Sequence, residues 1–195
     1  MMRIITGRAR GTKLYTLEGE NTRPTAERVK EAIFSMIQFD IEGRTVLDLF
    51  AGSGQMGLEA VSRGALHADL VDKSKQAIEV IRKNTVKTKL ALDCGVYCAD
   101  FSDFLQKHRG RGQYDLVFLD PPYDAKLIPE ALKCLLRYDL LKPIFTIVCE
   151  SRNEADIFRG DKALEAVFSV KKQVRYGTVC VTVLVPKDAE GTDAE

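Results

Sequence analysis

The segment Thr45-Val-Leu-Asp-Leu-Phe-Ala-Gly-Ser-Gly-Gln-Met-Gly57 decides the fold of this chain. It opens with an apolar, β-branched run that holds a single acid, Asp48, which is typical of a buried strand. Gly52, Gly54 and Gly57 follow in a G-x-G-x-x-G pattern, in which a strand turns sharply into a helix. Glycine lets the backbone approach a ligand closely, and the free N–H groups at a helix start favour an anion. The segment therefore predicts a strand, turn and helix that hold a nucleotide-type cofactor.

Downstream, apolar runs of strand length alternate with segments of helical periodicity, which predicts a βαβ array with a parallel sheet. The expected strands cover residues 45–50, 68–71, 95–99, 114–119, 145–149, 166–174 and 178–185. The expected covering helices span residues 57–63, 74–90 and 129–138, and a further helix is expected before the sheet, over residues 25–37. Because only Tyr176 and Gly177 mark the turn between the last two strands, they should form a hairpin. We expect an α/β fold with a seven-stranded, mostly parallel sheet whose last strand is antiparallel.

The ends of the chain differ in charge from its middle. The formal net charge is only +1, with 29 Lys and Arg against 28 Asp and Glu, which by itself predicts no polyanion partner. The first 15 residues, however, carry four cations and no acid, whereas the last eight carry four acids and no base. We expect a basic β-appendage over 1–22, a main domain over 23–187 and a disordered acidic tail over 188–195. The four cations are Arg3, Arg8, Arg10 and Lys13.

Several classes of protein are disfavoured by composition. No apolar run approaches the roughly 18 residues of a membrane span, and the start of the chain lacks a charged leader with an apolar stretch. We therefore expect a cytoplasmic protein. Cys94 and Cys98 have no second cysteine pair and no nearby histidine to complete a zinc site, so no metal is expected.

A second motif, Asp120-Pro-Pro-Tyr123, follows the apolar run 114–119 and so falls at the carboxyl end of a strand, where open α/β sheets bind ligands. Two prolines stop the strand, remove two N–H donors and leave carbonyl acceptors in a rigid corner. If the carboxylate of Asp120 and the carbonyl of Pro121 accept both hydrogens of an exocyclic base amine, its nitrogen can direct a lone pair at an electrophilic methyl group. Tyr123 offers a ring for base stacking. The motif therefore indicates methylation of an amino group on a nucleic-acid base.

Three of the remaining acids distinguish between two cofactors, whereas Glu150, near another strand end, is expected to be a cap or surface carboxylate. Asp72 lies 20 residues after Gly52, where a carboxylate can accept hydrogen bonds from a ribose, and this fits NAD and S-adenosylmethionine equally. Asp48 can bind the cationic amino group of a methionine moiety but would repel a pyrophosphate. Asp100 and Phe101 would offer a carboxylate and an N–H group to an adenine edge. These features favour S-adenosylmethionine, although Asp72 and Asp100 taken singly are also typical helix N-caps.

The chain also resembles the RsmD family, bacterial methyltransferases that modify guanine N2 in 16S ribosomal RNA. The resemblance covers nearly the whole chain and is most specific in the N-terminal Arg-Pro-Thr segment, because many amino-methyltransferases share the glycine and Asp-Pro-Pro-Tyr motifs. The residues that carry it are Arg3-Ile-Ile-Thr-Gly-Arg-Ala-Arg-Gly11, Thr22-Arg-Pro-Thr25, Arg28-Val-Lys-Glu-Ala-Ile-Phe34, Asp48-Leu-Phe-Ala-Gly-Ser-Gly54, Gly57-Leu-Glu-Ala60, Ser62-Arg-Gly-Ala65, Phe118-Leu-Asp-Pro-Pro-Tyr123 and Tyr176-Gly177.

The resemblance implies a class I S-adenosylmethionine-dependent methyltransferase fold, Rossmann-like, and a 16S rRNA target in an assembled or assembling small ribosomal subunit. The catalytic residues implied are Asp120, Pro121, Pro122 and Tyr123. The residues implied for the cofactor are Asp48, Gly52, Gly54, Asp72, Asp100 and Phe101. The basic appendage over 1–22, or N-terminal arm, would bind RNA. Arg23 and Thr25 would close over the cofactor or the nucleotide. We expect a monomer.

The motif chemistry leaves alternatives open. The same motif class serves adenine N6 in RNA or DNA, so the choice of guanine rests on the resemblance. The glycine pattern also permits an NAD-dependent oxidoreductase. A non-catalytic RNA-binding factor that kept the fold is the third alternative.

Overall fold

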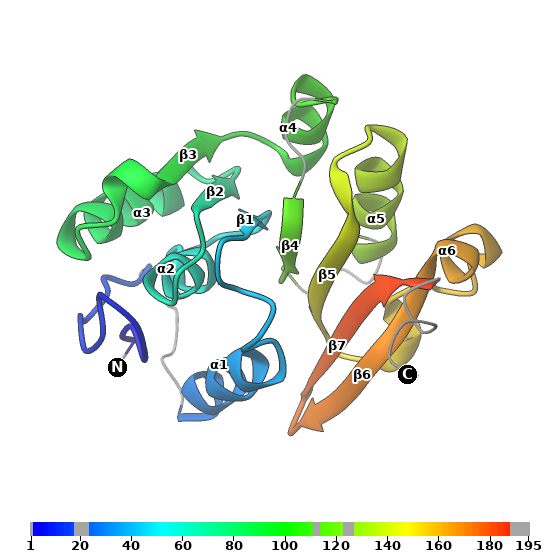
Figure 1. Cartoon of the computed structure of the whole chain (residues 1–195), viewed down its shortest axis with the longest axis horizontal. Coiled ribbons are helices and arrows are strands. Elements are labelled where there is room, and N and C mark those ends of the chain that lie inside the picture. Colours follow the sequence, from blue (N-terminus) through cyan, green and yellow to red (C-terminus); the bar gives the residue numbers. More distant parts are fainter. Residues whose placement is uncertain (1, 18–23, 111–113, 123–126, 188–195) are drawn as a thin grey trace.

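The computed structural model describes residues 2–17, 24–110, 114–122 and 127–187. Its centre is a seven-stranded sheet in the order β3-β2-β1-β4-β5-β7-β6 (Figure 1). The tail expected over 188–195 lies outside the described residues. The strands are β1 (Thr45–Asp48), β2 (His67–Asp72), β3 (Cys94–Cys98), β4 (Tyr114–Leu119), β5 (Leu141–Ser151), β6 (Phe168–Tyr176) and β7 (Val179–Pro186).

The sheet is mostly parallel, as the alternating sequence pattern predicts. Neighbouring strands from β3 through β5 all pair in parallel, whereas β7 pairs antiparallel with both β5 and β6. The chain turns from β6 into β7 at Gly177, whose φ of +61° favours glycine. The antiparallel last strand is thus confirmed. Its insertion between β5 and β6 is a feature that the hairpin pattern did not predict.

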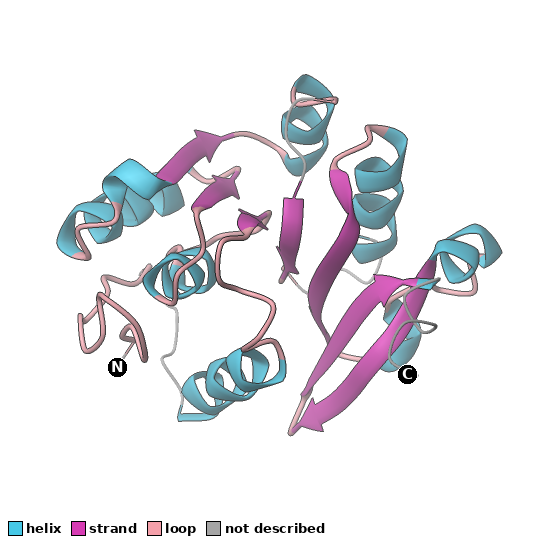
Figure 2. Ribbon diagram, viewed as in Figure 1, coloured by secondary structure: helices cyan, strands magenta, loops and turns pink. Residues whose placement is uncertain are grey.

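Helices cover both faces of the sheet (Figure 2). Side chains of α1, α2 and α3 pack in one apolar cluster, and those of α4, α5 and α6 pack in a second on the opposite face. Within the described part of the chain, no helix is both long and apolar enough to cross a membrane. The helices are α1 (Pro24–Met36), α2 (Gln55–Ser62), α3 (Lys75–Lys87), α4 (Phe101–Lys107), α5 (Leu127–Arg137) and α6 (Lys162–Val167), with short 3₁₀ turns η1 (Ala91–Asp93) and η2 (Glu154–Asp156).

Two of these helices, α4 and α6, were not predicted, and the strand expected over 166–174 was placed two residues too early. The strand expected to start at residue 166 starts at Phe168, because Asp161 caps α6 and holds residues 162–167 in a helix. The Asp161 carboxylate accepts hydrogen bonds from the Ala163 and Leu164 N–H groups at 3.0 and 3.3 Å. Side-chain acceptors of this kind satisfy N–H groups that have no partner within the helix.

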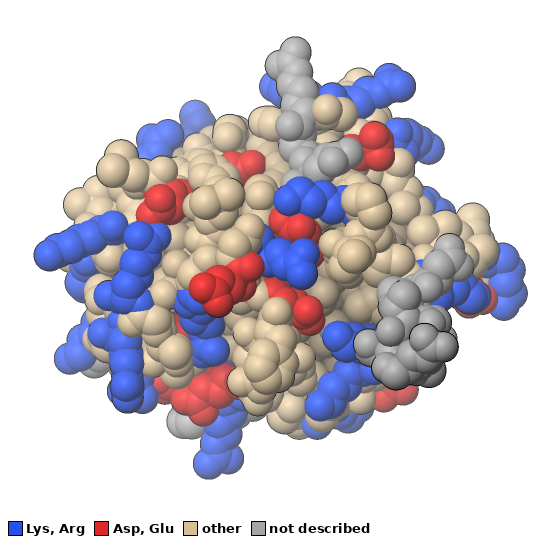
Figure 3. Space-filling view, in the orientation of Figure 1, with Lys and Arg blue, Asp and Glu red and all other residues tan. Residues whose placement is uncertain are grey.

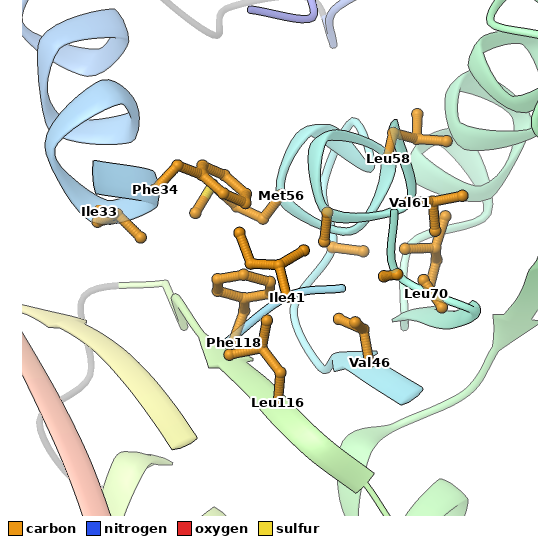
Figure 4. Close-up of a cluster of buried hydrophobic side chains, with 14 of the residues drawn as sticks. Ile33, Phe34, Ile41, Val46, Met56, Leu58, Val61, Leu70, Leu116 and Phe118 are labelled. Atoms are coloured by element: carbon orange, nitrogen blue, oxygen red, sulfur yellow. The ribbon is translucent and has the colours of Figure 1, made fainter. Parts of the chain in front are cut away.

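The core is built from strands that are buried on both faces. In β4, Leu116 and Phe118 point into the cluster under α1 and α2, while Val117 and Leu119 point into the other cluster, as the two-residue period of a strand requires. The Phe118 ring packs against Phe34 of α1 with centroids 5.7 Å apart (Figure 4). This packing positions the end of β4 rigidly against α1.

The N-terminal segment packs on the main domain. Ile4, Ala9 and Leu14 are buried in the same cluster as α1 and α2. A single antiparallel bridge joins Arg3 to Lys13, so this appendage has very little β structure among its described residues. Its apolar side chains anchor it, and its polar backbone needs partners of its own.

Those partners come from α2. Glu59 is fully buried and accepts hydrogen bonds from the Ile5 and Thr6 N–H groups at 2.7 and 3.0 Å, and its carboxylate also faces the Lys30 ammonium at 3.6 Å. At Gly7, a Cβ atom would come within 1.7 Å of the Ser62 carbonyl oxygen, so only glycine allows this close approach. The arm is therefore held by specific contacts and not by chain connectivity alone.

Candidate active site

A cavity of about 320 Å³ opens where the carboxyl ends of β1, β2 and β4 meet the start of α2. This is the edge at which open α/β sheets bind ligands. Four carboxylates and one lysine, Lys73, line its described part. The lining residues are Leu17, Asp48, Leu49, Phe50, Ala51, Gly52, Ser53, Gln55, Met56, Asp72, Lys73, Ser74, Ala99, Asp100, Phe101, Asp120, Pro122 and Leu127.

The glycine loop forms one wall of this cavity. Gly52 and Gly54 have φ angles of +55° and +78°, in the left-handed region that favours glycine, and α2 starts directly after Gly54. At Gly57, a Cβ atom would come within 2.1 Å of Leu70 Cδ2, so glycine is needed for α2 to pack closely on β2. The first two glycines shape the turn, and the third sets the distance between helix and sheet.

Asp48 lies at the bottom of the cavity with only 3% of its surface exposed. Its Oδ2 atom accepts a hydrogen bond from the Gly57 N–H at 3.0 Å. Burial, together with the nearby negative charges of Asp120 and Asp72, raises the pKa of this carboxyl group to about 7 against the opposing effect of the Gly57 hydrogen bond. Asp48 is thus poised to ionise when a cation enters the cavity.

Asp72 closes the glycine loop onto the second strand. Its Oδ2 atom accepts from the Gly52 N–H at 2.9 Å, and its Oδ1 atom accepts from the Ser74 N–H at 2.8 Å. Ser74, and not Asp72, caps α3, because its hydroxyl accepts from the Ala77 N–H. Each carboxylate oxygen retains further acceptor capacity toward the cavity.

Asp100 and Phe101 start a helix instead of ending a strand. Asp100 is exposed, and its Oδ1 atom accepts from both the N–H and the hydroxyl of Ser102, at 3.0 and 2.7 Å, which caps α4. The Phe101 ring packs against Phe50 with centroids 5.5 Å apart. The cap alternative considered for Asp100 is therefore correct for its structural role, and the residue lines the cavity as well.

The catalytic candidates follow β4, whose six residues are all buried. Asp120 is exposed at the end of this strand and lines the cavity, as does Pro122. Pro121 between them is buried. Tyr123, predicted to stack on the base, lies outside the described residues. The structure thus brings Asp120 and Asp48 together in the lining of one cavity.

Glu150 lies near Asp48 and Asp120, which the sequence analysis did not predict. There, Glu150 was interpreted as a cap or surface carboxylate. Register pairs Leu119 of β4 with Cys149 of β5, so Glu150, the next residue within β5, lies at the level where Asp120 follows β4. Glu150 is half-buried. Burial first, and then the negative charges of Asp120 and Asp48, raise the pKa of Glu150 well above its usual range. Its position at a strand end was visible in the sequence, but its neighbours were not.

The basic residues predicted to bind RNA lie away from the cavity wall. Arg3, Arg8, Arg10 and Lys13 are all exposed, but Arg3 pairs with Glu27 at 2.8 Å. Arg8 likewise pairs with Asp93, an acid contributed by η1. Arg23 lies outside the described residues, as does the Thr25 side chain, although the backbone of residue 25 belongs to α1.

The sheet order, the antiparallel β7 and a cavity of carboxylates at the ends of β1, β2 and β4 define the class of S-adenosylmethionine-dependent methyltransferases with the class I fold. The chain belongs to the family described as Conserved hypothetical protein 95, whose model matches residues 2–185. The resemblance to the RsmD family seen in the sequence is confirmed by its relatives.

Two relatives are named Ribosomal RNA small subunit methyltransferase D. The one from Haemophilus influenzae is 36% identical over 154 residues, covering 78% of this chain and 80% of that protein. The one from Escherichia coli is 32% identical over 195 residues, covering 100% and 94%. Among solved structures, yhhF from Escherichia coli has 31% sequence identity and a TM-score of 0.81, covering 95% of this chain and 97% of that chain.

Proposed function

We propose that this protein transfers a methyl group from S-adenosylmethionine to the N2 amino group of a guanine in 16S rRNA. The observation that carries the proposal is the position of Asp120 and the following prolines, which end β4 at a cavity lined by Asp48 and Asp72. An amine-activating carboxylate and a cation-binding carboxylate then share one cavity.

The chemistry of the cavity fits S-adenosylmethionine better than NAD. Four carboxylates against one lysine, among the described lining residues, attract a ligand with ammonium and sulfonium charges and repel a pyrophosphate. Asp48 would hold the amino group of the methionine moiety, Asp72 the ribose, and Asp100 with Phe101 the adenine. Gly52 and Gly54 would keep the loop backbone close to the ligand. When bound, S-adenosylmethionine supplies an electrophilic methyl group.

The residues after β4 would prepare the amine for attack. Asp120 would accept one hydrogen of the exocyclic amine, and the carbonyl of Pro121 would accept the other, so that the nitrogen lone pair is no longer delocalised into the base. Pro122 would keep this corner rigid, and Tyr123 would stack on the base. Such positioning supplies much of a rate enhancement, on the order of 7–11 kcal/mol in good intramolecular models.

The target and its setting are proposed from the relatives. Two relatives carry the name of a small-subunit rRNA methyltransferase. The proposal of guanine over adenine is supported by the RsmD resemblance. We propose that Arg10, Lys13 and the other arm cations contact RNA phosphates, and that Arg23 and Thr25 close over the nucleotide. The substrate would be 16S rRNA in a small ribosomal subunit, and the enzyme would act as a cytoplasmic monomer.

The test compares Asp120→Ala with Asp103→Ala, a matched variant that removes an exposed carboxylate on α4 outside the cavity lining. Each protein is incubated with labelled S-adenosylmethionine and unmethylated small subunits, naked 16S rRNA or DNA. The modified base is then identified by mass spectrometry, and S-adenosylhomocysteine binding is measured by calorimetry.

We expect N2-methylguanine in 16S rRNA with the wild type and with Asp103→Ala, and loss of methylation with retained cofactor binding in Asp120→Ala. N6-methyladenine would assign the adenine alternative instead. Binding of NADH without binding of S-adenosylhomocysteine would overturn the cofactor assignment. Retained function of Asp120→Ala in cells would point to a non-catalytic RNA-binding factor.

A further inference from the structure

A second, open groove lies between the N-terminal arm and α3. Its volume is about 600 Å³, and it is lined by Tyr15 and Val86 together with three cations of α3. Tyr15 is 50% exposed and Val86 is 70% exposed, so an aromatic ring and an aliphatic side chain both face solvent here. The three cations are Arg82, Lys83 and Lys87.

The solvent side of α3 is strongly basic. Lys75–Lys87 contains four cations and a single acid, Glu79. No ion pair is formed by Arg82, Lys83 or Lys87 with another described residue, in contrast to Arg3 and Arg8 of the arm. Figure 3 shows Lys and Arg side chains gathered along the edge of the molecule where α3 and the N-terminal arm lie. This concentration of charge suits a polyanion.

The backbone of Tyr15 is held by Asn84, and a lysine lies over its ring. Buried Asn84 accepts a hydrogen bond from the Tyr15 N–H at 2.8 Å and donates one to the Tyr15 carbonyl at 3.0 Å. The Lys87 ammonium sits over the ring, 4.1 Å from its centroid. The Lys87 ammonium shows that this face of the ring is accessible. A flat, polarisable group can occupy the same face, because a cation and such a group both interact with the π-electrons of the ring.

The groove is joined to the candidate active site through the same asparagine. The Asn84 amide also donates to the carbonyl of Ser53 in the glycine loop, at 2.9 Å. Ser53 lines the cavity, as does Leu17, which lies two residues beyond Tyr15. A single side chain thus spans from the groove to the cavity wall, and the backbone from Tyr15 to Leu17 runs between them.

We propose that this groove binds a single-stranded RNA nucleotide flanking the methylated base, with the flanking base stacked on Tyr15 and Val86. The base displaces the Lys87 ammonium from the ring, and Lys87 then pairs with RNA phosphates beside Arg82 and Lys83. An unpaired strand is selected because a base inside a duplex has no free face to stack on the ring. The inference rests on the proposed function, in which the substrate is RNA, and it assigns a second RNA-binding site to the protein.

The test uses two variants and their matched controls. Tyr15→Ala removes the ring and Tyr15→Phe keeps it. Arg82→Ala/Lys83→Ala/Lys87→Ala removes the groove cations, and Arg137→Ala/Lys162→Ala/Lys172→Ala removes three exposed cations from α5, α6 and β6. Binding of a labelled single-stranded RNA of about 12 nucleotides, a length within known site sizes, is measured against salt concentration, with a duplex of equal length beside it.

We expect Tyr15→Ala to weaken single-strand binding about tenfold and Tyr15→Phe to leave it unchanged, within the range known for base stacking on aromatic side chains. The triple variant should reduce the slope of log affinity against log salt by about 2, since each phosphate contact on a single strand contributes about 0.7. The control triple should leave the slope near the wild-type value. Binding of S-adenosylhomocysteine should be the same in all variants.

Equal affinity of Tyr15→Ala and wild type, or equal slopes of the two triple variants, would overturn the inference. Preference for the duplex would do so as well. Methylation of small subunits separates this failure from failure of the proposed function. If the wild type modifies 16S rRNA while the groove variants keep the wild-type KM, only the groove inference is lost.

Discussion

The buried carboxyl group of Asp48 should make the stability of the free protein depend on pH. In the unfolded chain this group ionises near its ordinary pKa of 3.8, whereas burial raises its pKa to about 7 in the folded protein. The contribution of Asp48 to stability is therefore fully present below pH 3.8 and is lost as pH rises through 7. At 1.36 kcal/mol for each pKa unit, the loss is about 4 kcal/mol.

Asp48→Asn removes this dependence with little change of shape. The amide oxygen of asparagine can still accept the Gly57 hydrogen bond, but the group carries no charge at any pH. We expect the variant to unfold at higher urea concentration than the wild type at pH 8 and to lose this advantage toward pH 4. Urea denaturation followed by circular dichroism between pH 4 and 8 measures the difference.

The same substitution should have the opposite effect on cofactor binding. An ammonium group pairs with the ionised form of Asp48, so the affinity for S-adenosylhomocysteine should fall about tenfold for each pH unit below 7 in the wild type. In Asp48→Asn the affinity should be low and nearly independent of pH. Calorimetry on both proteins tests this. The reasoning would be refuted if the stability of the wild type and its affinity for S-adenosylhomocysteine changed in the same direction with pH.

Three further substitutions test the packing and the acid cluster. Gly57→Ala should cost about 1–3 kcal/mol of unfolding free energy, because its Cβ would overlap Leu70, and urea denaturation would show no loss if α2 can shift instead. Glu59→Ala should cost about 3–5 kcal/mol, because it leaves Lys30 as a buried charge without its acid; restored stability on adding Lys30→Met would support this cause. Glu150→Gln should stabilise the free protein at neutral and higher pH relative to the wild type, because burial and the charges of Asp120 and Asp48 make the ionised form of Glu150 unfavourable in the folded protein. Identical melting profiles of Glu150→Gln and wild type from pH 5 to 9 would contradict that assignment.

Short helices were the part of the fold that sequence periodicity could not show. The seven residues of α4 and the six of α6 make fewer than two turns each, too few for a repeat of 3.6 to stand out from chance. Their N-caps, Asp100 and Asp161, were the available signal. Asp100 was weighed as a cap, but its position after an apolar run favoured a strand end.

Neighbour relations across the sheet were equally hidden in the candidate site. The sequence places Asp48, Asp120 and Glu150 each near the end of a predicted strand. That they share one region follows from the strand order β1-β4-β5 and from the pairing of Leu119 with Cys149. Local motifs do not determine which strands lie side by side, and so Glu150 was assigned to the surface.

The sequence by itself determined the α/β class, the glycine turn after the first strand and the Asp-Pro-Pro corner, because each depends on side chains only a few residues apart. The tertiary structure decided how buried Asp48 is, which acids surround it, and how Asn84 ties Tyr15 to the glycine loop. Burial and electrostatic coupling arise from strands and helices far apart in the chain. Their effects on pKa and on binding therefore depend on the strand order and register set by packing of the whole core.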